Sequence, residues 1–194
     1  LCKGVQLLGE LPEKTIHEII NHASIITSYL FAAACNAIFK NSHWIDGREI
    51  LVAERINGAI VCNEEASLAN IQKIGNKLES GIHVISGSAA RDARSNTIGF
   101  GKGGGDLSAS FFAGLLNANQ IEIWSSLHAY TTADPLLVKN AKTITEITYE
   151  EAIELSHFEN NLVAPVALNN AIKKRIPINI RSFDNMSDVA TLIH

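Results

Sequence analysis

Cysteine is scarce in this sequence, which has three cysteines among 194 residues, at positions 2, 35 and 62. The count is odd, the three lie far apart, and none forms a Cys-x-x-Cys pair. Neither a disulfide framework nor a zinc site is therefore indicated. Because free thiols are typical of a reducing compartment, we expect a cytoplasmic protein.

Dense positive charge and long apolar runs are also missing. Sixteen Lys and Arg stand against twenty Asp and Glu, for a net charge of −4. Nucleic-acid binding needs clustered basic side chains that neutralise phosphates, so nucleic acid is not expected as a partner. The best apolar run, residues 28–39, is about a dozen residues long, whereas a membrane span needs roughly 20. We expect a buried helix there and no membrane partner.

The length and composition are those of one globular domain, because 46% of the residues are hydrophobic and 19% are charged. The sequence begins at Leu1, without an initiating Met and without the charged-then-apolar pattern of a signal peptide. We therefore expect an N-terminally truncated chain. No internal repeat, low-complexity tract or interdomain linker is present.

Two hydrophobic periods alternate along the chain. Apolar residues at helical spacing predict helices, and short β-branched runs between them predict strands. The expected helices are 15–39, 64–79, 106–118, 148–158 and 165–174; the expected strands are 82–87, 120–125 and 176–181, with a short strand and turn in 43–52. Strands separated by helices favour a three-layer α/β sandwich, with a mainly parallel sheet between helices.

Three of these helices carry a start signal. Thr15 with Glu18, and Thr148 with Glu151, have the spacing of a capping box, in which the two side chains bond the first backbone N–H groups. Pro165 stands at the first position of the last helix, where a missing N–H is tolerated.

Glycine is concentrated in residues 99–105, GFGKGGG, which we call the glycine loop. The loop leads into an expected helix, and the N–H groups and dipole at a helix start favour an anion such as phosphate. A flexible surface loop is the alternative interpretation of the same residues. The loop also matches the dinucleotide pattern G-x-G-x-x-G. That pattern requires a strand running directly into its first glycine, and a polar loop is expected here instead.

Asp106 follows the glycine loop and has two interpretations. Its carboxylate could cap the helix and do nothing else. It could also lie near bound phosphates, where it would interact with a metal ion or orient a neighbouring base. The residues alone leave both open.

Four stretches occur in the order and spacing of the aspartate kinase catalytic domain: TIGFGKGGGDLSAS, IEIW…TTADP, NAKTITEITYEEAIELSHF and KKRIPINIRSF. From about Leu7 onward the chain resembles the amino-acid-kinase family, and aspartokinases fused to homoserine dehydrogenase in particular. The resemblance implies a sandwich that binds ATP with Mg²⁺ and phosphorylates the β-carboxylate of L-aspartate, in the biosynthesis of lysine, threonine and methionine. It also implies a homo-oligomer, with residues 1–194 forming the C-terminal two-thirds of the catalytic domain and no regulatory domain.

The resemblance carries functional roles onto particular residues. The family has R-G-G-S-D where this chain has residues 102–106, so Lys102 and Asp106 would be catalytic. It further implies nucleotide binding by Gly101, Gly103, Gly104, Gly105, Trp124, Thr132 and Asp134, and substrate binding by Gly87 and Ser24. It assigns no metal ligand.

Several charged family positions are replaced in this chain. Ser24 and Ile25 stand where the family's G-E-R-L-S segment has its acid and arginine, and the K-F-G-G-T-S segment has no counterpart. Other charges are replaced by Ser126, Leu136 and Asn161. Three hypotheses follow: a working aspartate kinase, a catalytically inactive member with a nucleotide-binding or regulatory role, and an unrelated Rossmann-type binder. We expect catalysis by this chain to be strongly impaired.

Overall fold

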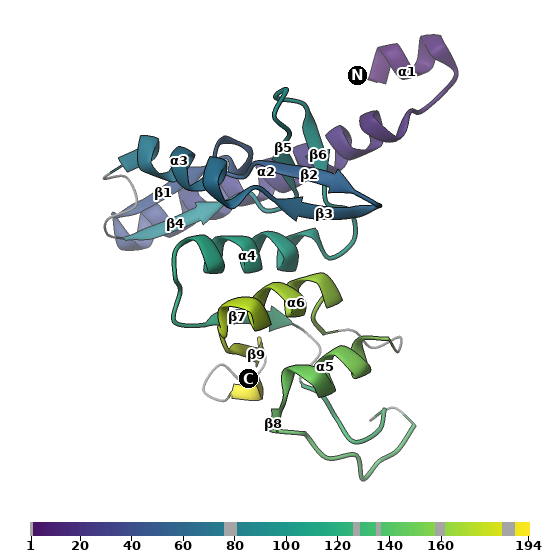
Figure 1. Cartoon of the computed structure of the whole chain (residues 1–194), viewed down its shortest axis with the longest axis vertical. Coiled ribbons are helices and arrows are strands. Elements are labelled where there is room, and N and C mark those ends of the chain that lie inside the picture. The colour runs from purple at the N-terminus through teal and green to yellow at the C-terminus, as the bar shows by residue number, and fades with distance from the viewer. Residues whose placement is uncertain (1, 76–80, 126–128, 135–136, 158–161, 184–188) are drawn as a thin grey trace. The chain divides into compact units, whose positions relative to one another are not determined.

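The computed structural model describes residues 2–75, 81–125, 129–134, 137–157, 162–183 and 189–194. Helices and short strands alternate along them (Figure 1). The chain divides into two compact units, Leu1–Gly105 and Asp106–His194, and each is described by itself.

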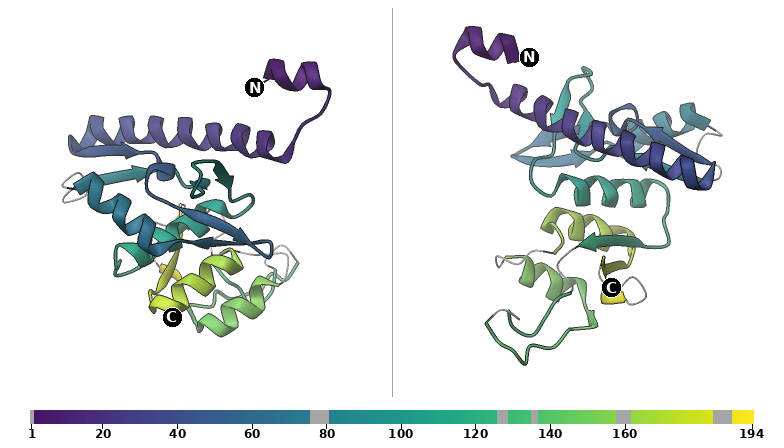
Figure 2. Two further views of the ribbon diagram at one scale, coloured as in Figure 1. Left: turned by 45° about the horizontal axis from the view of Figure 1, so that its top comes forward. Right: turned by 180° about the vertical axis from the view of Figure 1, so that it is seen from behind.

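The first unit combines helices with pairs of short strands. Its helices are α1 (Cys2–Leu8), α2 (Glu13–Phe39) and α3 (Glu64–Ile74), and a 3₁₀ turn spans Gly47–Glu49. Strand β1 (Ser42–Ile45) pairs in parallel with β4 (Ile82–Ile85), while β2 (Ala53–Ile56) with β3 (Ala59–Cys62), and β5 (Ala89–Arg91) with β6 (Thr97–Gly99), form antiparallel hairpins. The long helix α2 lies against β1, β4 and β6 (Figure 2).

Helix α2 begins earlier than the sequence predicts. Its N-cap is Pro12, and no side chain caps the first turn, so the predicted capping box of Thr15 and Glu18 is wrong. The carbonyl of Pro12 accepts hydrogen bonds from the N–H groups of Thr15 (2.8 Å) and Ile16 (3.1 Å). The proline ring restricts the φ of Pro12, which is −57°. The helix can therefore begin here without a side-chain cap.

The expectation of a buried helix over residues 28–39 is also wrong. Ala32 and Cys35 are buried, but Phe31 is 61% exposed and Ile38 is 72% exposed. One face of α2 packs on the strands, and within the described residues nothing covers the opposite face. By length and composition alone, the described stretch Thr15–Phe39 is long and apolar enough to cross a membrane, and 6% of its most apolar window is buried.

The sequence prediction misses two hairpins in this unit. The turn between β2 and β3 is Asn57–Gly58, with φ of 50° and 83°, which is the Asn-Gly pattern of a two-residue hairpin turn. Strands β5 and β6 occupy the stretch that was expected to be a polar loop. As a result, a strand runs directly into the glycine loop at Gly99.

The second unit is built on a four-stranded sheet, with the order β7-β9-β10-β8 among the described residues. The strands are β7 (Ile121–Ser125), β8 (Glu146–Ile147), β9 (Ile178–Ser182) and β10 (Val189–Ile193). The helices are α5 (Tyr149–Ser156) and α6 (Pro165–Lys174), and α4 (Gly104–Leu115) begins two residues before the unit boundary. The core contains Ile121, Ala152, Leu168, Ile178, Ile180 and Ile193.

The predicted helix starts of this unit are confirmed. Thr148 and Glu151 form the reciprocal capping box, and Pro165 is the first residue of α6. Strands β7 and β9 match the predicted strands 120–125 and 176–181, and β4 in the first unit matches 82–87. The α/β class is therefore confirmed, although antiparallel pairings are as common as parallel ones among the described strands.

Candidate functional site

The glycine loop makes a tight turn between β6 and α4. The N–H of Gly104 donates to the carbonyl of Gly101 (3.1 Å), and φ is 72° at Gly101 and 77° at Gly103. Side chains other than glycine rarely adopt these positive angles. The turn therefore depends on glycine at both positions, and it sets Gly104 as the first residue of α4.

The glycines at 104 and 105 have different surroundings. A Cβ at Gly104 would lie 2.8 Å from the Cβ of Phe100, whereas a Cβ at Gly105 would have nothing within 4 Å. Gly104 is buried, and Gly105 and Lys102 are exposed. Glycine is thus required at 104 for packing, whereas a small side chain at 105 would meet no neighbouring atom.

The strand, loop and helix order overturns one reason against the G-x-G-x-x-G pattern, because β6 does reach Gly99 without an intervening polar loop. The topology nevertheless differs from a dinucleotide fold, in which strand, helix and next strand form one parallel unit. Here β6 belongs to a hairpin, and the strand after α4 is β7, which pairs with β9 in another sheet.

Asp106 does not cap its own helix, because α4 has already begun at Gly104. Its Oδ2 accepts a hydrogen bond from the N–H of Ala164 (3.1 Å), the residue that precedes α6. Burial raises the pKa of this carboxyl, and the Ala164 bond only partly offsets the rise. Within the described part of the chain, no ion pair compensates for the charge of Asp106. Such a carboxylate is typical of a functional position.

Tyr130 lies beside this carboxylate. Its ring is buried, and its hydroxyl lies near the backbone N–H groups of Leu162 and Val163. Burial raises the pKa of the phenol, the backbone N–H groups of Leu162 and Val163 lower it, and the charge of Asp106 raises it further. The site around Asp106 therefore contains a buried hydroxyl that the sequence comparison did not identify.

Gly87, the predicted substrate residue, lies in the first unit, directly after Ser86. The hydroxyl of Ser86 accepts a hydrogen bond from the N–H of Gly47 (2.9 Å) and donates to Oδ1 of Asp46 (3.4 Å). Ser86 is 1% exposed. These contacts fix the position of Ser86 and so of the backbone that leads into Gly87.

The residue after Gly87 connects this segment with both α2 and the glycine loop. The hydroxyl of Ser88 donates to Oδ1 of Asn21 (2.7 Å), and its carbonyl accepts the N–H of Phe100 (2.9 Å). Ser24, the other predicted substrate residue, is partly buried one turn after Asn21 on α2. The structure thus brings the predicted substrate segment against the base of the glycine loop.

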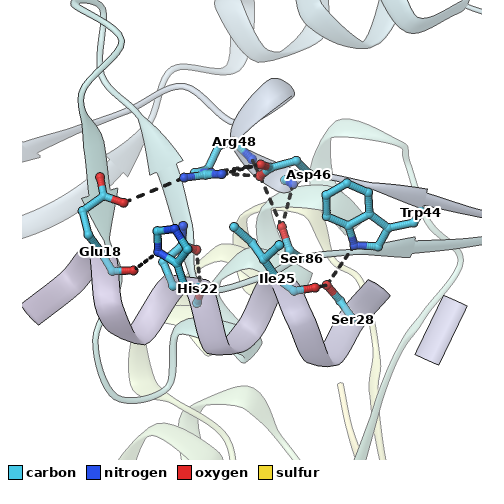
Figure 3. A network of polar contacts seen from close by, with 11 residues as sticks. Glu18, His22, Ile25, Ser28, Trp44, Asp46, Arg48 and Ser86 are labelled. Carbon is cyan, nitrogen blue, oxygen red and sulfur yellow. Dashed lines mark hydrogen bonds and ion pairs between the residues drawn. The ribbon is translucent and has the colours of Figure 1, made fainter. Parts of the chain in front are cut away.

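An acid and arginine pair near this segment was not predicted from the sequence. Arg48 donates from Nε and Nη2 to the carboxylate of Asp46 at 2.6–3.1 Å, and its Nη1 lies 3.9 Å from Oε2 of Glu18 (Figure 3). Burial alone would raise the pKa of Asp46, but the hydrogen bonds and charge of Arg48, together with Ser86, hold it below its usual value. The local signal is the Asp-x-Arg spacing after β1.

Trp124, assigned to the nucleotide side, lies on β7 in the second unit and is 38% exposed. Its ring packs against Phe183, with centroids 5.9 Å apart, and the Arg181 guanidinium lies 5.7 Å from its centroid. Nε of Arg181 also donates to Oε1 of Glu122 (2.9 Å). The indole is therefore fixed in a partly exposed position.

Thr132 and Asp134 have structural partners in the loop that follows β7. The hydroxyl of Thr132 accepts the N–H of Lys142 (3.0 Å), and the carbonyl of Asp134 accepts the N–H groups of Leu137 and Val138. Among the replaced charged positions, Ser126, Leu136 and Asn161 lie outside the described residues. Ser24, Gly87 and the glycine loop belong to the first unit; Asp106, Trp124, Thr132 and Asp134 belong to the second.

A bound metal ion would have few protein ligands among the described residues. Within the described ranges, no group of three or more His, Cys, Asp and Glu could hold a metal ion. Mg²⁺, however, is usually bound through one or two carboxylates together with substrate phosphates. Asp106 fits this requirement, because a hydrogen bond occupies its Oδ2 and none to a described residue occupies its Oδ1.

The family model of the amino acid kinase family matches residues 6–182. The chain therefore belongs to the amino acid kinase family, and the hypothesis of an unrelated Rossmann-type binder is wrong. Within the family the chain is similar to aspartokinases. Its whole length aligns with 24% of the bifunctional aspartokinase/homoserine dehydrogenase of Buchnera aphidicola, at 29% identity. A stretch of 91% of the chain aligns with 39% of the lysine-sensitive aspartokinase 3 of Escherichia coli, at 27% identity.

Solved structures give the same fold. Aspartokinase III of Escherichia coli, in complex with aspartate and ADP, matches 93% of this chain with a TM-score of 0.81 and 24% identity, over 40% of its own length. The aspartate kinase of Clostridium acetobutylicum matches 89% of the chain with a TM-score of 0.73 and 28% identity, over 38% of its length. The chain thus spans from about a quarter to two fifths of the relatives that it matches.

Replacing Gly104 by Ala should destabilise the first unit. The new Cβ would press on Phe100, and overpacking of this kind costs about 1–3 kcal/mol. Gly105→Ala is the matched control in the same helical turn, and it should be neutral or stabilise the chain by a few tenths of a kcal/mol, because alanine favours helix. Urea denaturation measures both. Equal unfolding free energies for the two variants would contradict the packing role of Gly104.

Asp106→Asn should raise the melting temperature at pH 7–8 by about 1–3 °C. Since the folded pKa of Asp106 is raised, the ionised carboxylate lowers stability above that pKa, and the loss disappears as the pH falls below the ordinary carboxyl range. Asparagine keeps an acceptor for the Ala164 N–H without the charge. Calorimetric scans from pH 3 to 8 should show the two curves converging in acid. A less stable variant at pH 8 would show that the ionised form is favoured instead.

Proposed function

We propose that the chain binds the phosphates of Mg·ATP at the glycine loop and is a weak aspartate kinase. The observation that carries this proposal is the turn from Gly101 to Gly104, which starts α4 beside the unobstructed Gly105. Backbone N–H groups at such a helix start bind anions, and they do so without any particular side chain. The similarity to aspartokinases supports aspartate as the acceptor.

The reaction is a single phosphoryl transfer. An oxygen of the aspartate β-carboxylate attacks the γ-phosphorus, the bond to the oxygen that bridges to the β-phosphate breaks, and ADP leaves with that electron pair. Negative charge spreads over the transferring oxygens in the transition state. The N–H groups at the start of α4 and the exposed ammonium of Lys102 would neutralise that charge. Magnesium, held by Asp106 and the phosphates, would supply further neutralisation.

The substrate side explains why the activity should be weak. Gly87 and Ser24 carry no charge, so a substrate carboxylate there would depend on neutral donors. Arg48, which lies beside the contact of Asp46 with Ser86, is already paired with Asp46 and Glu18. Its charge is therefore committed to the fold of the first unit.

A second candidate function is nucleotide binding without catalysis, in a regulatory role. The replacement of the family's acid and arginine by Ser24 and Ile25 favours it, because these changes leave the glycine loop unaltered while removing charge from the acceptor side. Activity and binding measured together separate the two candidates.

Nucleotide binding should depend on the space beside Gly105. Gly105→Val places two methyl groups over the start of α4, and we expect at least a 10-fold loss of ATP affinity in isothermal titration calorimetry. Gly105→Ala is the size control and should lose much less. Adenosine lacks phosphates, so its affinity should be weak and should not differ between the two variants. Equal ATP binding by wild type and Gly105→Val would show that the loop does not hold the phosphates.

Turnover should be at least about 10⁴-fold below that of an intact aspartokinase, because loss of one preorganised donor costs about 10²–10³ and losses within one site are not additive. Trapping aspartyl phosphate as its hydroxamate measures the rate, with Escherichia coli aspartokinase assayed in parallel. Residual activity that disappears in Asp106→Asn supports the kinase. ATP binding with no activity supports the regulatory candidate, and turnover near one per second would contradict both.

A further inference from the structure

Arg55, on β2, reaches the glycine loop with its guanidinium. Its Nη2 donates to the carbonyl of Gly99 at 3.4 Å, and its Nη1 donates to the carbonyl of Gly58 at 3.5 Å. Gly99 is the last residue of β6 and the first residue of the glycine loop, and Gly58 belongs to the turn of the β2–β3 hairpin. The two contacts therefore place a positive charge where the loop begins.

Both hydrogen bonds of this side chain are long. An N–H···O bond in a protein usually measures about 2.7–3.2 Å, so contacts of 3.4 and 3.5 Å hold the guanidinium weakly. Its Nε–H and its remaining Nη N–H groups have no partner among the described residues. The side chain is also exposed. Arg55 is thus held beside the loop with donors left over for a ligand.

The other arginines whose side chains make contacts in the described part of the chain are paired with acids. Arg48 and Arg181 each form an ion pair with a carboxylate. Arg55, in contrast, contacts only carbonyl oxygens within the same described ranges, and these carry no formal charge. Guanidinium groups recognise carboxylates and phosphates through their fixed fork of N–H donors. The charge of Arg55 is therefore available to an anion, whereas the other two charges are neutralised.

The end of the glycine loop that Arg55 contacts adjoins the predicted substrate segment. Phe100, the residue after Gly99, donates its N–H to the carbonyl of Ser88, which follows the predicted substrate glycine. Lys102, the exposed cation of the loop, is three residues beyond Gly99 and so at most about 11 Å from it between Cα atoms. Two cations therefore lie at the same short stretch of backbone.

We propose that Arg55 binds an oxyanion of the ligand at the glycine loop, either a carboxylate of the acceptor or an oxygen of the transferring phosphoryl group. This role rests on the proposed function, which brings both groups to the loop. A planar guanidinium can meet either anion with two parallel N–H···O bonds. Because charge-assisted bonds are shorter and stronger than neutral ones, the ligand replaces the long bond to the Gly99 carbonyl.

Isothermal titration calorimetry with Mg·ATP, and separately with L-aspartate, tests this role in the 194-residue chain. Arg55→Gln keeps N–H donors but removes the charge, so it should bind at least one of the two ligands about 5-fold or more weakly. The ligand that responds identifies the oxyanion. Arg55→Lys should recover part of the loss, and the loss should shrink as salt is added. Arg94→Gln is the matched control: it removes an exposed arginine from the turn between β5 and β6 and should bind like the wild type.

Urea denaturation of the same variants separates ligand binding from a purely structural role, in which Arg55 only joins the β2–β3 hairpin to β6. A lower unfolding free energy of Arg55→Gln, with unchanged affinity for both ligands, would overturn the proposal and leave the proposed function standing. So would an equal loss of affinity in Arg94→Gln. A wild type that binds neither ligand would overturn the proposed function and this role with it.

Chemical modification of arginine gives a second test, without any substitution. Phenylglyoxal reacts with accessible guanidinium groups, and peptide mass spectrometry locates the products. Arg55 should react in the free chain and should react at least about 3-fold more slowly in the presence of Mg·ATP and L-aspartate together, because a bound oxyanion covers its free N–H groups. Arg94 should react at the same rate with and without the ligands. Equal rates at Arg55, or equal protection of both arginines, would overturn the proposal.

Discussion

The hydrogen bond from Gly104 to Gly101 is the interaction on which the candidate site depends. It closes a turn that requires positive φ at Gly101 and Gly103, and it decides where α4 begins. The hydrogen bond from Phe100 to the Ser88 carbonyl holds the turn beside the Ser88 segment, and the close approach of Phe100 leaves no room for a Cβ at Gly104. The N–H groups of the first turn of a helix point away from the helix, so this start is suited to hold phosphate oxygens.

The same helix start determines the surroundings of Asp106. As the third residue of α4, Asp106 reaches the N–H of Ala164 instead of capping its own helix, and burial raises its pKa. A buried carboxylate that lowers the stability of the fold in this way is typical of a functional position. On the substrate side, the charge of Arg48 is neutralised by Asp46 and Glu18. Phosphate binding that depends on backbone, together with a weakly charged acceptor side, is the common basis of both proposed functions.

Local signals in the sequence predict the features that depend on neighbouring residues. The capping box of Thr148, the proline at the start of α6 and the glycine loop are all read from a few adjacent residues, and the structure confirms them as elements. The features that the sequence does not predict depend on residues far away along the chain. The side on which α2 is covered, the bond from Ala164 to Asp106 and the pairing of β5 with β6 are set by tertiary contacts, which hydrophobic period and spacing do not reveal. The Asn57–Gly58 turn is the exception, because its Asn-Gly signal is local.

Amide chemical shifts in solution test most directly whether the start of α4 holds nucleotide phosphates. In a ¹⁵N-labelled chain titrated with Mg·ADP, we expect the largest shifts at the amides of Gly103, Gly105 and Asp106. Titration with adenosine should leave those amides unmoved. Equal shifts with adenosine and Mg·ADP, or shifts by Mg·ADP confined to residues outside the glycine loop and the first turn of α4, would contradict phosphate binding at this helix start.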